Sequence, residues 1–492
     1  MNRVEIPSSP IECPNLIGGE WVKGSGNKTD IYSPYSGNVV GSFNTPDQKE
    51  LDSALELANK AFERWSKAPL KERTQIMFRF REILLRDIEK FANTISLESG
   101  KTLNESRAGV MKGIEVLEFA LSIQNLDNGA KMEVSRGVHC EFRRVPLGPV
   151  LSITPFNFPA MVPMWTIPIS ITLGNAYVWK PSEKTPLTAT LVGQALIEAG
   201  LPNGVLTIIN GAKQEVNALI DSPLIKAVAF VGSSKIAKMV YERAAVNGKR
   251  ALALGGAKNH IILLPDADPE MCGVGIADSF TGCAGQRCMA ASVLLAVGDV
   301  DKQIEKIKER AQSTTCGDKM GAIITKEQLN FLNEAIDEAV KEGATLLLDG
   351  REFKKPDGYN EGYWIAPTIL DNVKPNSKAS KNELFGPILS IIRCENISQA
   401  LEIENANEYG NAASVFTNNG AMAEKVAANA NAAMVGINIG VPVPREPFSF
   451  AGMNNSKFGH GEITGEQSIH FWTNLKKVTT KWEMQKDHNW MS

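Results

Sequence analysis

The 492-residue sequence lacks an excess of charge of either sign. Lys and Arg together number 52 and Asp and Glu together number 55, which gives a formal net charge of -3. Blocks of basic residues favour binding to nucleic acid, and blocks of acidic residues are typical of interaction tails. Neither feature is present, so we expect no nucleic-acid partner.

Long hydrophobic runs are also missing. Residues 1–22 contain no apolar stretch that resembles a signal peptide, and prolines interrupt them repeatedly. The most apolar region, residues 149–179, holds five prolines together with Asn157 and Asn175. This composition argues against a membrane span and favours buried core. We expect a cytoplasmic protein with no membrane partner.

Cysteine is sparse and shows no scaffold spacing. The seven cysteines include no Cys-x-x-Cys pair, and no histidine lies at metal-ligand spacing from any of them. This pattern argues against a disulfide framework and against a zinc site, and we expect no bound metal. Any special cysteine should therefore act alone, as a nucleophile.

What the sequence does contain is enough material for two or three α/β domains. Hydrophobic residues make up 43% and charged residues 22%, as in ordinary globular proteins. Residues 45–65 predict a helix with Thr45 as N-cap, Pro46 at the first position and Gln48 completing a capping box. Two further helical segments follow before residue 125.

From about Val145 short β-rich runs alternate with helical stretches, which indicates parallel βαβ units. A second alternation spans about 259–451. Ligands of open parallel sheets bind at the carboxyl ends of the strands. The segments that follow strands read "PFNFP", "KPSE" and "GSSK", and we expect functional residues among them.

The ordered motifs "PFNFP", "KPSE", "FVGSS", "LGGAKNH", "GQRC" and "ELFGP" resemble the aldehyde dehydrogenase superfamily over essentially the whole chain. Within it, "PFNFPAMVP", "GAKNH", "GQRCMA" and "PFSFAG" are most similar to the CoA-acylating methylmalonate-semialdehyde dehydrogenases. Any one motif is weak evidence, whereas the ordered set is specific.

The resemblance implies that Cys288 is the nucleophile, and it assigns no role to Cys283. Only the thiolate attacks an aldehyde, and a free cysteine has a pKa of about 8.5. Adjacent Arg287 and a cofactor cation are expected to lower that pKa. The resemblance also implies that the amide of Asn157, with the Cys288 N–H, stabilises the oxyanion that attack creates.

The resemblance further implies NAD as cofactor. Lys180 and Glu183 match residues that hold the adenosine ribose, and a carboxylate at 183 favours NAD over NADP because it repels a 2′-phosphate. Gly232 and Ser233 open a helix after a strand, a setting suited to pyrophosphate, although no Gly-x-Gly-x-x-Gly is present there. The full set assigned to the cofactor is Phe156, Lys180, Glu183, Gly232, Ser233, Glu383 and Phe385.

One family residue is missing. Hydrolytic members carry Glu-Leu-Gly-Gly-Lys, in which the Glu activates the water that cleaves the thioester. Here the segment reads Ala-Leu-Gly-Gly-Ala-Lys, and either Ala253 or Leu254 takes the Glu position. Neither side chain accepts a proton, so we expect the thioester to await a thiol, and CoA is the cosubstrate that the resemblance implies.

For the substrate, the resemblance implies a semialdehyde whose carboxylate is held by two arginines. Arg287 matches the first, and the second position is Lys112, which keeps the charge but loses the bidentate fork. Two interpretations of Lys112 stay open: a substrate contact, or a solvated lysine on a helix surface. His260 is expected to be a packed histidine.

The implied fold is α/β, with a Rossmann-like NAD domain, an α/β catalytic domain and a small β oligomerisation element. The expected ranges are 1–122 and 143–254 for the NAD domain, 255–455 for the catalytic domain, 123–142 and 472–492 for the oligomerisation element, and 456–471 for a return segment. A strand that extends a neighbour's sheet indicates a homo-oligomer, a dimer or a tetramer.

We therefore predict NAD-dependent oxidation of a malonate-type or methylmalonate-type semialdehyde, with acyl transfer to CoA and loss of CO2. Two alternatives stay open. One is a hydrolytic or other-acceptor aldehyde dehydrogenase. The other is a catalytically silent NAD-binding structural protein, which NAD binding without thiol labelling at Cys288 would favour.

Overall fold

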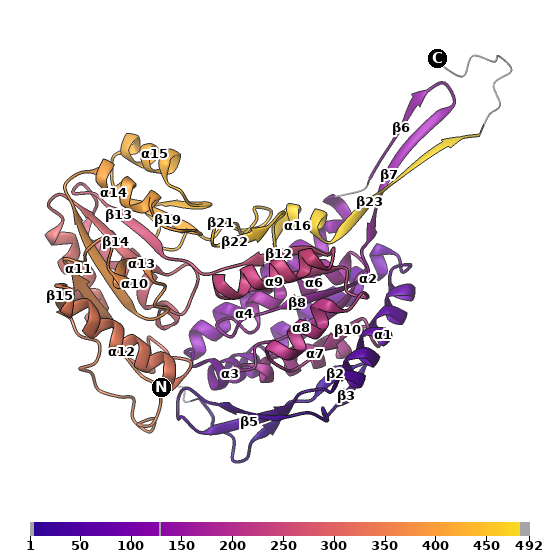
Figure 1. The fold of residues 1–492 in the computed structure, drawn as a ribbon, viewed down its shortest axis with the longest axis horizontal. Helices are drawn as coiled ribbons and strands as arrows, with labels where there is room; N and C mark the ends of the chain where they lie inside the picture. Colours follow the sequence, from indigo (N-terminus) through magenta and orange to yellow (C-terminus); the bar gives the residue numbers. More distant parts are fainter. Residues whose placement is uncertain (1–3, 127–128, 483–492) are drawn as a thin grey trace.

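The computed structural model describes residues 4–126 and 129–482, and it is an α/β structure with two large, mainly parallel sheets (Figure 1). The chain begins with a three-stranded sheet in the order β1-β5-β4, formed by Ile11–Glu12, Val39–Asn44 and Lys28–Tyr32. Four helices follow: α1 (Gln48–Trp65), α2 (Leu70–Arg86), α3 (Ile88–Ser99) and α4 (Leu103–Leu126).

The start of α1 differs from the expectation. Asp47, not Thr45, is the N-cap: its side chain accepts from the Glu50 N–H at 2.9 Å, and Glu50 accepts from the Asp47 N–H at 2.7 Å. The Thr45 hydroxyl instead accepts from the Asn27 N–H at 3.1 Å, in the turn beside β4. The helix therefore begins with a reciprocal Asp47–Glu50 capping box, because the Thr45 hydroxyl is already hydrogen-bonded to Asn27.

The first large sheet has eight strands in the order β22-β12-β11-β8-β9-β10-β2-β3. Its parallel centre consists of β8 (Pro149–Ile153), β9 (Ala176–Lys180), β10 (Leu206–Ile208), β11 (Ala227–Val231) and β12 (Arg250–Leu254). Antiparallel strands β2 (Asn15–Ile17), β3 (Glu20–Val22) and β22 (Lys457–Gly459) complete the edges.

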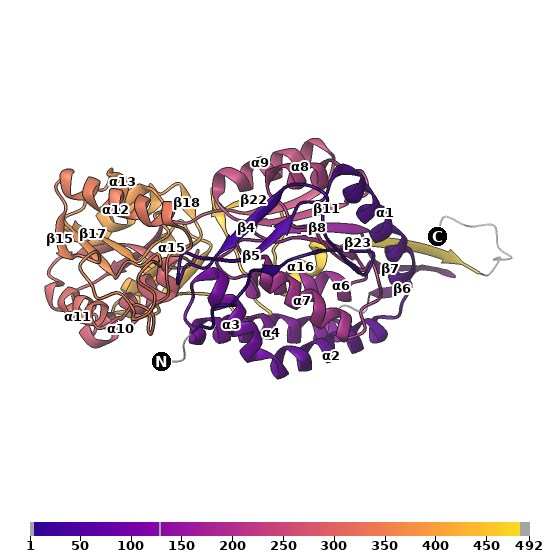
Figure 2. The ribbon, with the colours of Figure 1, turned by 90° about the horizontal axis from the view of Figure 1, so that it is seen from below.

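Helices cover both faces of this sheet, as Figure 2 shows for α8 and α9 on one side and α3 and α4 on the other. The connecting helices are α5 (Met161–Met164), α6 (Ile167–Thr172), α7 (Pro186–Glu198), α8 (Lys213–Asp221) and α9 (Ser234–Val246). Successive residues of β9 enter opposite cores: Tyr177 and Trp179 pack in one cluster and Val178 in the other. This alternation is the period of two that a sheet buried on both faces requires.

The second large sheet has seven strands in the order β15-β16-β17-β14-β13-β19-β20. The strands are β13 (Asn259–Leu263), β14 (Ala291–Val297), β15 (Thr345–Leu348), β16 (Thr368–Asp371), β17 (Ile388–Cys394), β19 (Ala412–Phe416) and β20 (Met434–Ile437). Its helices are α10 (Pro269–Thr281), α11 (Asp301–Gln312), α12 (Lys326–Lys341), α13 (Lys378–Lys381), α14 (Ile397–Asn405) and α15 (Gly420–Asn429). Only β15 pairs antiparallel, at one edge.

A third sheet projects from the body as an arm (Figure 1). It pairs β6 (Ala130–Ser135), β7 (Val138–Pro146) and β23 (Thr473–Lys481), all antiparallel. The short strands β18 (Tyr409–Gly410) and β21 (Met453–Asn454) pair with each other, and helix α16 (Gly465–Phe471) lies within the expected return segment. Parts of the predicted units, 1–3, 127–128 and 483–492, lie outside the described residues, and the domain boundaries stay predictions.

Candidate active site

The carboxyl ends of three adjacent strands bring the predicted motifs together. Strand β8 lies between β11 and β9 in parallel register, with Ile153 opposite both Phe230 and Lys180. The chain after β8 carries Phe156 and Asn157. Gly232 follows β11, and Lys180 ends β9, so one edge of the sheet gathers the residues expected to contact the nucleotide and the aldehyde.

The segment before the predicted nucleophile is a tight left-handed turn. Cys283, Ala284 and Gly285 have φ values of 55°, 52° and 67°. A left-handed conformation costs about 1–2 kcal/mol for each non-glycine residue, so packing must hold this turn in place. A Cβ on Gly285 would lie 2.1 Å from the Gly386 carbonyl oxygen, hence only glycine fits there. The segment "GQRC" therefore packs directly against the segment "ELFGP" at this turn.

Gln286 anchors the loop that carries Cys288. Its side-chain amide donates to the Ala322 carbonyl at 3.0 Å and accepts from the Ile324 N–H at 2.9 Å. Its own carbonyl accepts from Asn157 Nδ2 at 3.0 Å. The predicted oxyanion donor is therefore hydrogen-bonded to the residue two positions before the nucleophile, across 129 residues of chain.

Two asparagines that sequence reasoning missed hold the Cys288 backbone. Asn259 Nδ2 and Asn411 Nδ2 donate to the Cys288 carbonyl at 2.7 and 2.9 Å. Asn259 belongs to the quoted motif "GAKNH", which was a usable signal. Asn411 lies in no motif, and only the pairing of β13 with β19 brings it to the site.

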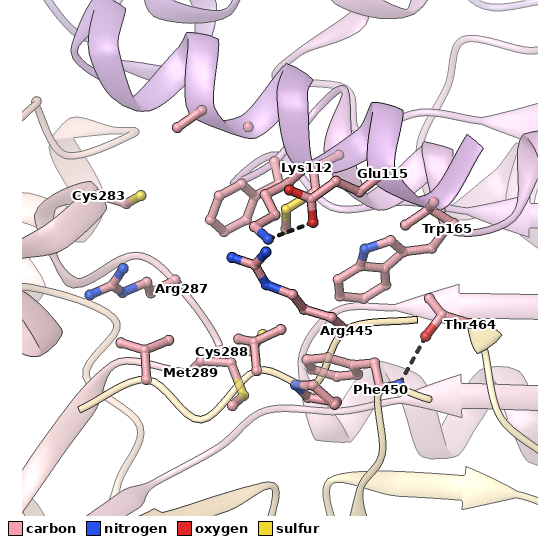
Figure 3. Close-up of a pocket in the computed structure, with 18 of the residues that line it drawn as sticks. Lys112, Glu115, Trp165, Cys283, Arg287, Cys288, Met289, Arg445, Phe450 and Thr464 are labelled. Atoms are coloured by element: carbon pink, nitrogen blue, oxygen red, sulfur yellow. Dashed lines mark hydrogen bonds and ion pairs between the residues drawn. The ribbon is translucent and has the colours of Figure 1, made fainter. Parts of the chain in front are cut away.

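A cavity of about 330 Å³ opens beside the nucleophile and is lined by Cys288, Cys283 and Arg287 (Figure 3). Its apolar wall includes Trp165 and Phe450, whose ring centroids are 4.7 Å apart. Further apolar lining comes from Val116, Phe158, Met161, Met289, Val441 and Val443. The charged lining residues are Glu105, Lys112, Glu115, Arg287, Arg445 and Glu446.

Burial raises the pKa of the Cys288 thiol to about 12, and the negative charge of Glu383 acts in the same direction. Backbone N–H groups and Arg287 oppose this effect less strongly. Thiolate is therefore a minor species in the free protein. Sequence reasoning expected Arg287 to lower the thiol pKa, and it does so only in part, because the first two causes are larger.

Arg287 is largely engaged with α10. Its Nη2 donates to the carbonyls of Asp278 and Ser279, at 2.5 and 2.7 Å, in the last turn of that helix. A guanidinium suits this position because the last carbonyls of a helix lack intrahelical partners and carry partial negative charge. Lys112, on α4, donates to Glu115 Oε2 at 2.6 Å and also lines the cavity.

The residues predicted to hold the adenosine ribose lie together at the end of β9. Lys180 is buried, donates to the Gly211 carbonyl at 3.0 Å and lies 3.6 Å from Glu183 Oε2. Burial lowers the pKa of Lys180, and Glu183 partly offsets this. Ser233 is the exposed N-cap of α9, directly after Gly232.

The residues predicted to hold the nicotinamide half lie on the opposite loop. Phe385 contacts Phe156 edge to face, with ring centroids 5.9 Å apart. Glu383 Oε1 accepts from the Ala257 N–H at 3.0 Å. A Cβ on Gly256 would lie 2.3 Å from Glu383 Oε2, so the glycine pair ahead of Ala257 makes room for this carboxylate.

A buried lysine accompanies Glu383. Lys258 is 1% exposed, and its Nζ has no hydrogen-bond partner within the described residues. Burial lowers the pKa of Lys258 to about 7, and Glu383 acts in the opposite sense. Burial likewise raises the pKa of Glu383 to about 7, against the effects of the Ala257 N–H and Lys258. Burial therefore disfavours the charged form of each group, and the opposite charge of its partner restores part of it.

The two positions that stand for the family's water-activating glutamate lie in the sheet. Ala253 and Leu254 end β12 and are buried, paired with β11 and β22.

His260 is a packed histidine, as expected: it is buried, its Nδ1 lies 3.3 Å from Asn407 Nδ2, and burial lowers its pKa to about 3. In the described ranges, no cluster of three or more His, Cys, Asp or Glu residues is arranged to hold a metal. No helix among those residues is long and apolar enough to cross a membrane.

Comparison with known proteins places these observations in a family. The model of the aldehyde dehydrogenase family matches residues 21–478. A malonate-semialdehyde dehydrogenase of Halalkalibacterium halodurans is 38% identical over 95% of this chain and 98% of its own, and malonate-semialdehyde dehydrogenase 2 of Geobacillus thermodenitrificans is 39% identical with the same coverage.

Solved structures agree. One from Sinorhizobium meliloti 1021, described as a candidate methylmalonate-semialdehyde dehydrogenase complexed with NAD, has a TM-score of 0.95 and 37% identity, and it covers 98% of this chain and 100% of its own. The methylmalonate-semialdehyde dehydrogenase of Oceanimonas doudoroffii has a TM-score of 0.94 and 36% identity, with 96% and 99% coverage.

Proposed function

Because the chain belongs to the aldehyde dehydrogenase family, we propose that it oxidises a malonate-type or methylmalonate-type semialdehyde with NAD and transfers the acyl group to CoA. The names of the relatives support the substrate class. The observation that supports CoA as acyl acceptor is the lack of a base where hydrolytic members have their glutamate: Ala253 or Leu254 takes that position, and both are apolar. A site that forms a thioester without activating water suits a thiol acceptor.

The first step is attack of the Cys288 thiolate on the aldehyde carbon. The carbonyl π electrons move to oxygen, and the resulting oxyanion of the thiohemiacetal accepts from Asn157 and from the Cys288 N–H. Asn157 can serve because an amide nitrogen carries two hydrogens and Gln286 takes only one of them. Preorganised donors of this kind contribute about 3–4 kcal/mol to the transition state.

The residues present fit a nicotinamide dinucleotide. Lys180 and Glu183 lie at the end of β9, and Ser233 is the N-cap residue of the helix after β11, two strands away in the same sheet. Glu383 acts electrostatically on Cys288 from the loop that also carries Phe385. When bound, NAD accepts the hydride that leaves the thiohemiacetal carbon. Glu383 would accept from ribose hydroxyls in its ionised form, and Phe385 with Phe156 would set the position of the ring.

Oxidation leaves an acyl group on Cys288 as a thioester. With a malonate-type substrate the β-carboxylate leaves as CO2, because the thioester carbonyl takes up the electron pair of the broken C–C bond and a proton then completes the acyl group. The CoA thiolate next attacks the thioester carbonyl, and the Cys288 thiolate departs. The overall reaction therefore consumes one CoA for each NADH that it forms.

The decisive experiment measures NADH formation from malonate and methylmalonate semialdehydes, with and without CoA, in single-turnover and steady-state conditions. We expect a burst of about one NADH per active site that stops without CoA and becomes steady turnover with it. Cys288→Ala should abolish the burst, whereas Cys394→Ala, at a buried cysteine on β17 away from the cavity, is the matched control.

A hydrolytic alternative has one observation in its favour. Glu383 is a carboxylate with a pKa near 7 that acts electrostatically on Cys288. Equal steady turnover with and without CoA would support this alternative and would contradict thiol-dependent release. NAD binding with no burst and no labelling of Cys288 would instead support a silent structural protein.

We also propose a cytoplasmic homo-oligomer, a dimer or a tetramer. All seven cysteines are free, as a reducing compartment favours. The arm of β6, β7 and β23 exposes Met132, Val134, Phe142 and Leu475, and exposed apolar strands are typical of surfaces that pair with another chain. Light scattering on the purified protein tests the assembly, and a monomer at micromolar concentration would contradict it.

A further inference from the structure

Three cationic side chains line the cavity beside Cys288, and they differ in whether they already have hydrogen-bond partners within the protein. Arg287 donates to the carbonyls of Asp278 and Ser279, and Lys112 donates to Glu115. Arg445 has no hydrogen bond or ion pair from its guanidinium to any of the described residues, although it lines the same cavity. Among the three cations that line the cavity, Arg445 is the one whose bidentate fork is free of hydrogen bonds and ion pairs to the described residues.

The direction of this side chain is visible in Figure 3. Arg445 belongs to the segment after β20, and its guanidinium turns from that segment across the cavity toward Lys112 and Glu115 on α4. The two cationic heads thus face one space from opposite walls. The aromatic pair Trp165 and Phe450 forms a wall beside them.

We infer that Arg445 binds the carboxylate of the substrate and supplies the bidentate contact that Lys112 cannot make. This inference rests on the proposed function and names a specificity-determining residue for it. A planar guanidinium bonds both oxygens of a carboxylate, whereas an ammonium acts as a point charge. The substrate is accordingly an aldehyde that carries an anionic carboxylate at the end remote from the reacting carbon.

The carboxylates of the cavity explain why a fork is needed in addition to charge. Glu105, Glu115 and Glu446 offset the charges of Lys112, Arg287 and Arg445, so the cavity has no strong overall positive field. Glu105 is occupied by the Cys283 N–H, and Glu115 by Lys112. Selection of an anion in such balanced surroundings depends on directed hydrogen bonds more than on net charge.

The test compares aldehydes that differ only in the charged group. Malonate semialdehyde and propanal each have three carbons, and succinate semialdehyde and butanal repeat the comparison with four. For each pair the readout is the ratio of kcat/KM for the acid to kcat/KM for the neutral aldehyde. The variants are Arg445→Met, Arg445→Lys and Lys112→Met. Arg64→Met, at an exposed arginine in the last turn of α1, is the matched control.

We expect Arg445→Met to lower the ratio about tenfold to a hundredfold, the usual range for a lost hydrogen bond between charged groups. Arg445→Lys should recover part of this loss, and Arg64→Met should leave the ratio unchanged. An unchanged ratio in Arg445→Met overturns the inference. So does a loss confined to Lys112→Met, because the lysine would then be the anchor.

Failure of the proposed function has a different signature. Turnover of malonate semialdehyde that needs no CoA contradicts acyl transfer but leaves the acid-to-neutral ratios measurable. If the parent enzyme accepts only the four-carbon acid, the second pair decides the role of Arg445. A parent enzyme that prefers both neutral aldehydes overturns the inference about Arg445, whatever the acceptor.

Discussion

Replacing Glu383 by glutamine should make the Cys288 thiol of the free enzyme easier to ionise. Glu383 is the second-largest cause of the raised pKa of this thiol, after burial. Glutamine has the same shape, and its carbonyl oxygen can still accept from the Ala257 N–H, which now bonds Glu383 Oε1 at 3.0 Å. The substitution therefore removes the charge while keeping the hydrogen bond that positions the side chain.

The expected change in reactivity follows from the pKa of the thiol and from the usual effect of a neighbouring charge on a pKa. With a thiol pKa of about 12, roughly one molecule in 10,000 carries thiolate at pH 8, since each pH unit below the pKa is a factor of ten. A neighbouring charge changes a pKa by about one to three units. Glu383→Gln should accordingly raise the rate of Cys288 alkylation at pH 8 by about tenfold or more.

The shape of the pH profile gives a second signature. The pKa of Glu383 is about 7, so its carboxylate ionises between pH 6 and 8 and increasingly opposes thiolate formation there. The logarithm of the parent alkylation rate should rise by less than one per pH unit in this window. In Glu383→Gln it should rise more steeply across this window, because the charge at position 383 no longer changes there.

The assay is alkylation by iodoacetamide without NAD, with peptide mass spectrometry to assign the label to Cys288 among the seven cysteines. Glu424→Gln, at an exposed acid on α15, is the matched control and should follow the parent profile. Superimposable profiles for Glu383→Gln and the parent enzyme, with the same melting temperature, would refute the electrostatic coupling between Glu383 and Cys288.

Three further predictions concern other parts of the site and the fold. Asn157→Ala should slow the NADH burst about 100-fold to 1,000-fold in stopped-flow measurements, and a burst within threefold of the parent would contradict its role as oxyanion donor. Lys258→Met removes a cation that lowers the pKa of Glu383. That pKa should rise above 7, so NAD affinity measured by calorimetry should fall at pH 7 and recover toward pH 9, and an unchanged pH dependence would count against this reasoning. Glu98 accepts from the N–H groups of Leu187 and Thr188 at 2.8 Å each, and burial raises its pKa to about 8. Because this folded-state pKa lies above the unfolded value of about 4.3, the folded state binds more protons in between and the parent loses stability as pH rises from 5 to 8. Glu98→Gln should reduce that loss, which melting temperatures at pH 5, 6.5 and 8 would reveal.

The sequence was sufficient for the parts of the site that local pattern determines. Phe156, Asn157, Lys180 and Gly232 follow or end strands whose β-rich runs are plain, and parallel strands must end at a common edge. The missing acid at Ala253 or Leu254 was equally readable. These features need no knowledge of which distant segments meet.

The sequence was insufficient where a contact from far along the chain determines the local structure. Asn411 bonds the Cys288 carbonyl across 123 residues, and nothing around it distinguishes it from other asparagines. Arg445 follows a run of valines and prolines with no periodic pattern, so its place over the cavity depends on the path of the whole return segment. The cap of α1 moved to Asp47 for the same kind of reason, since Asn27 already bonds Thr45.

The loop that carries Cys288 packs closely against the loop that carries Glu383 and Phe385, because Gly285 and the Gly386 carbonyl approach each other. The Gly386 carbonyl occupies the space that a side chain at 285 would fill, and the Gln328 side-chain amide donates to the Leu384 carbonyl of the same loop at 2.7 Å. A displacement of Glu383 or Phe385 would therefore be transmitted to the turn that precedes Cys288. Because ionised Glu383 also raises the pKa of the thiol, hydrogen bonds from a ribose to that carboxylate would weaken its repulsion of the thiolate. Thiol reactivity should accordingly increase when NAD is bound, and equal rates of Cys288 alkylation with and without NAD would contradict this coupling.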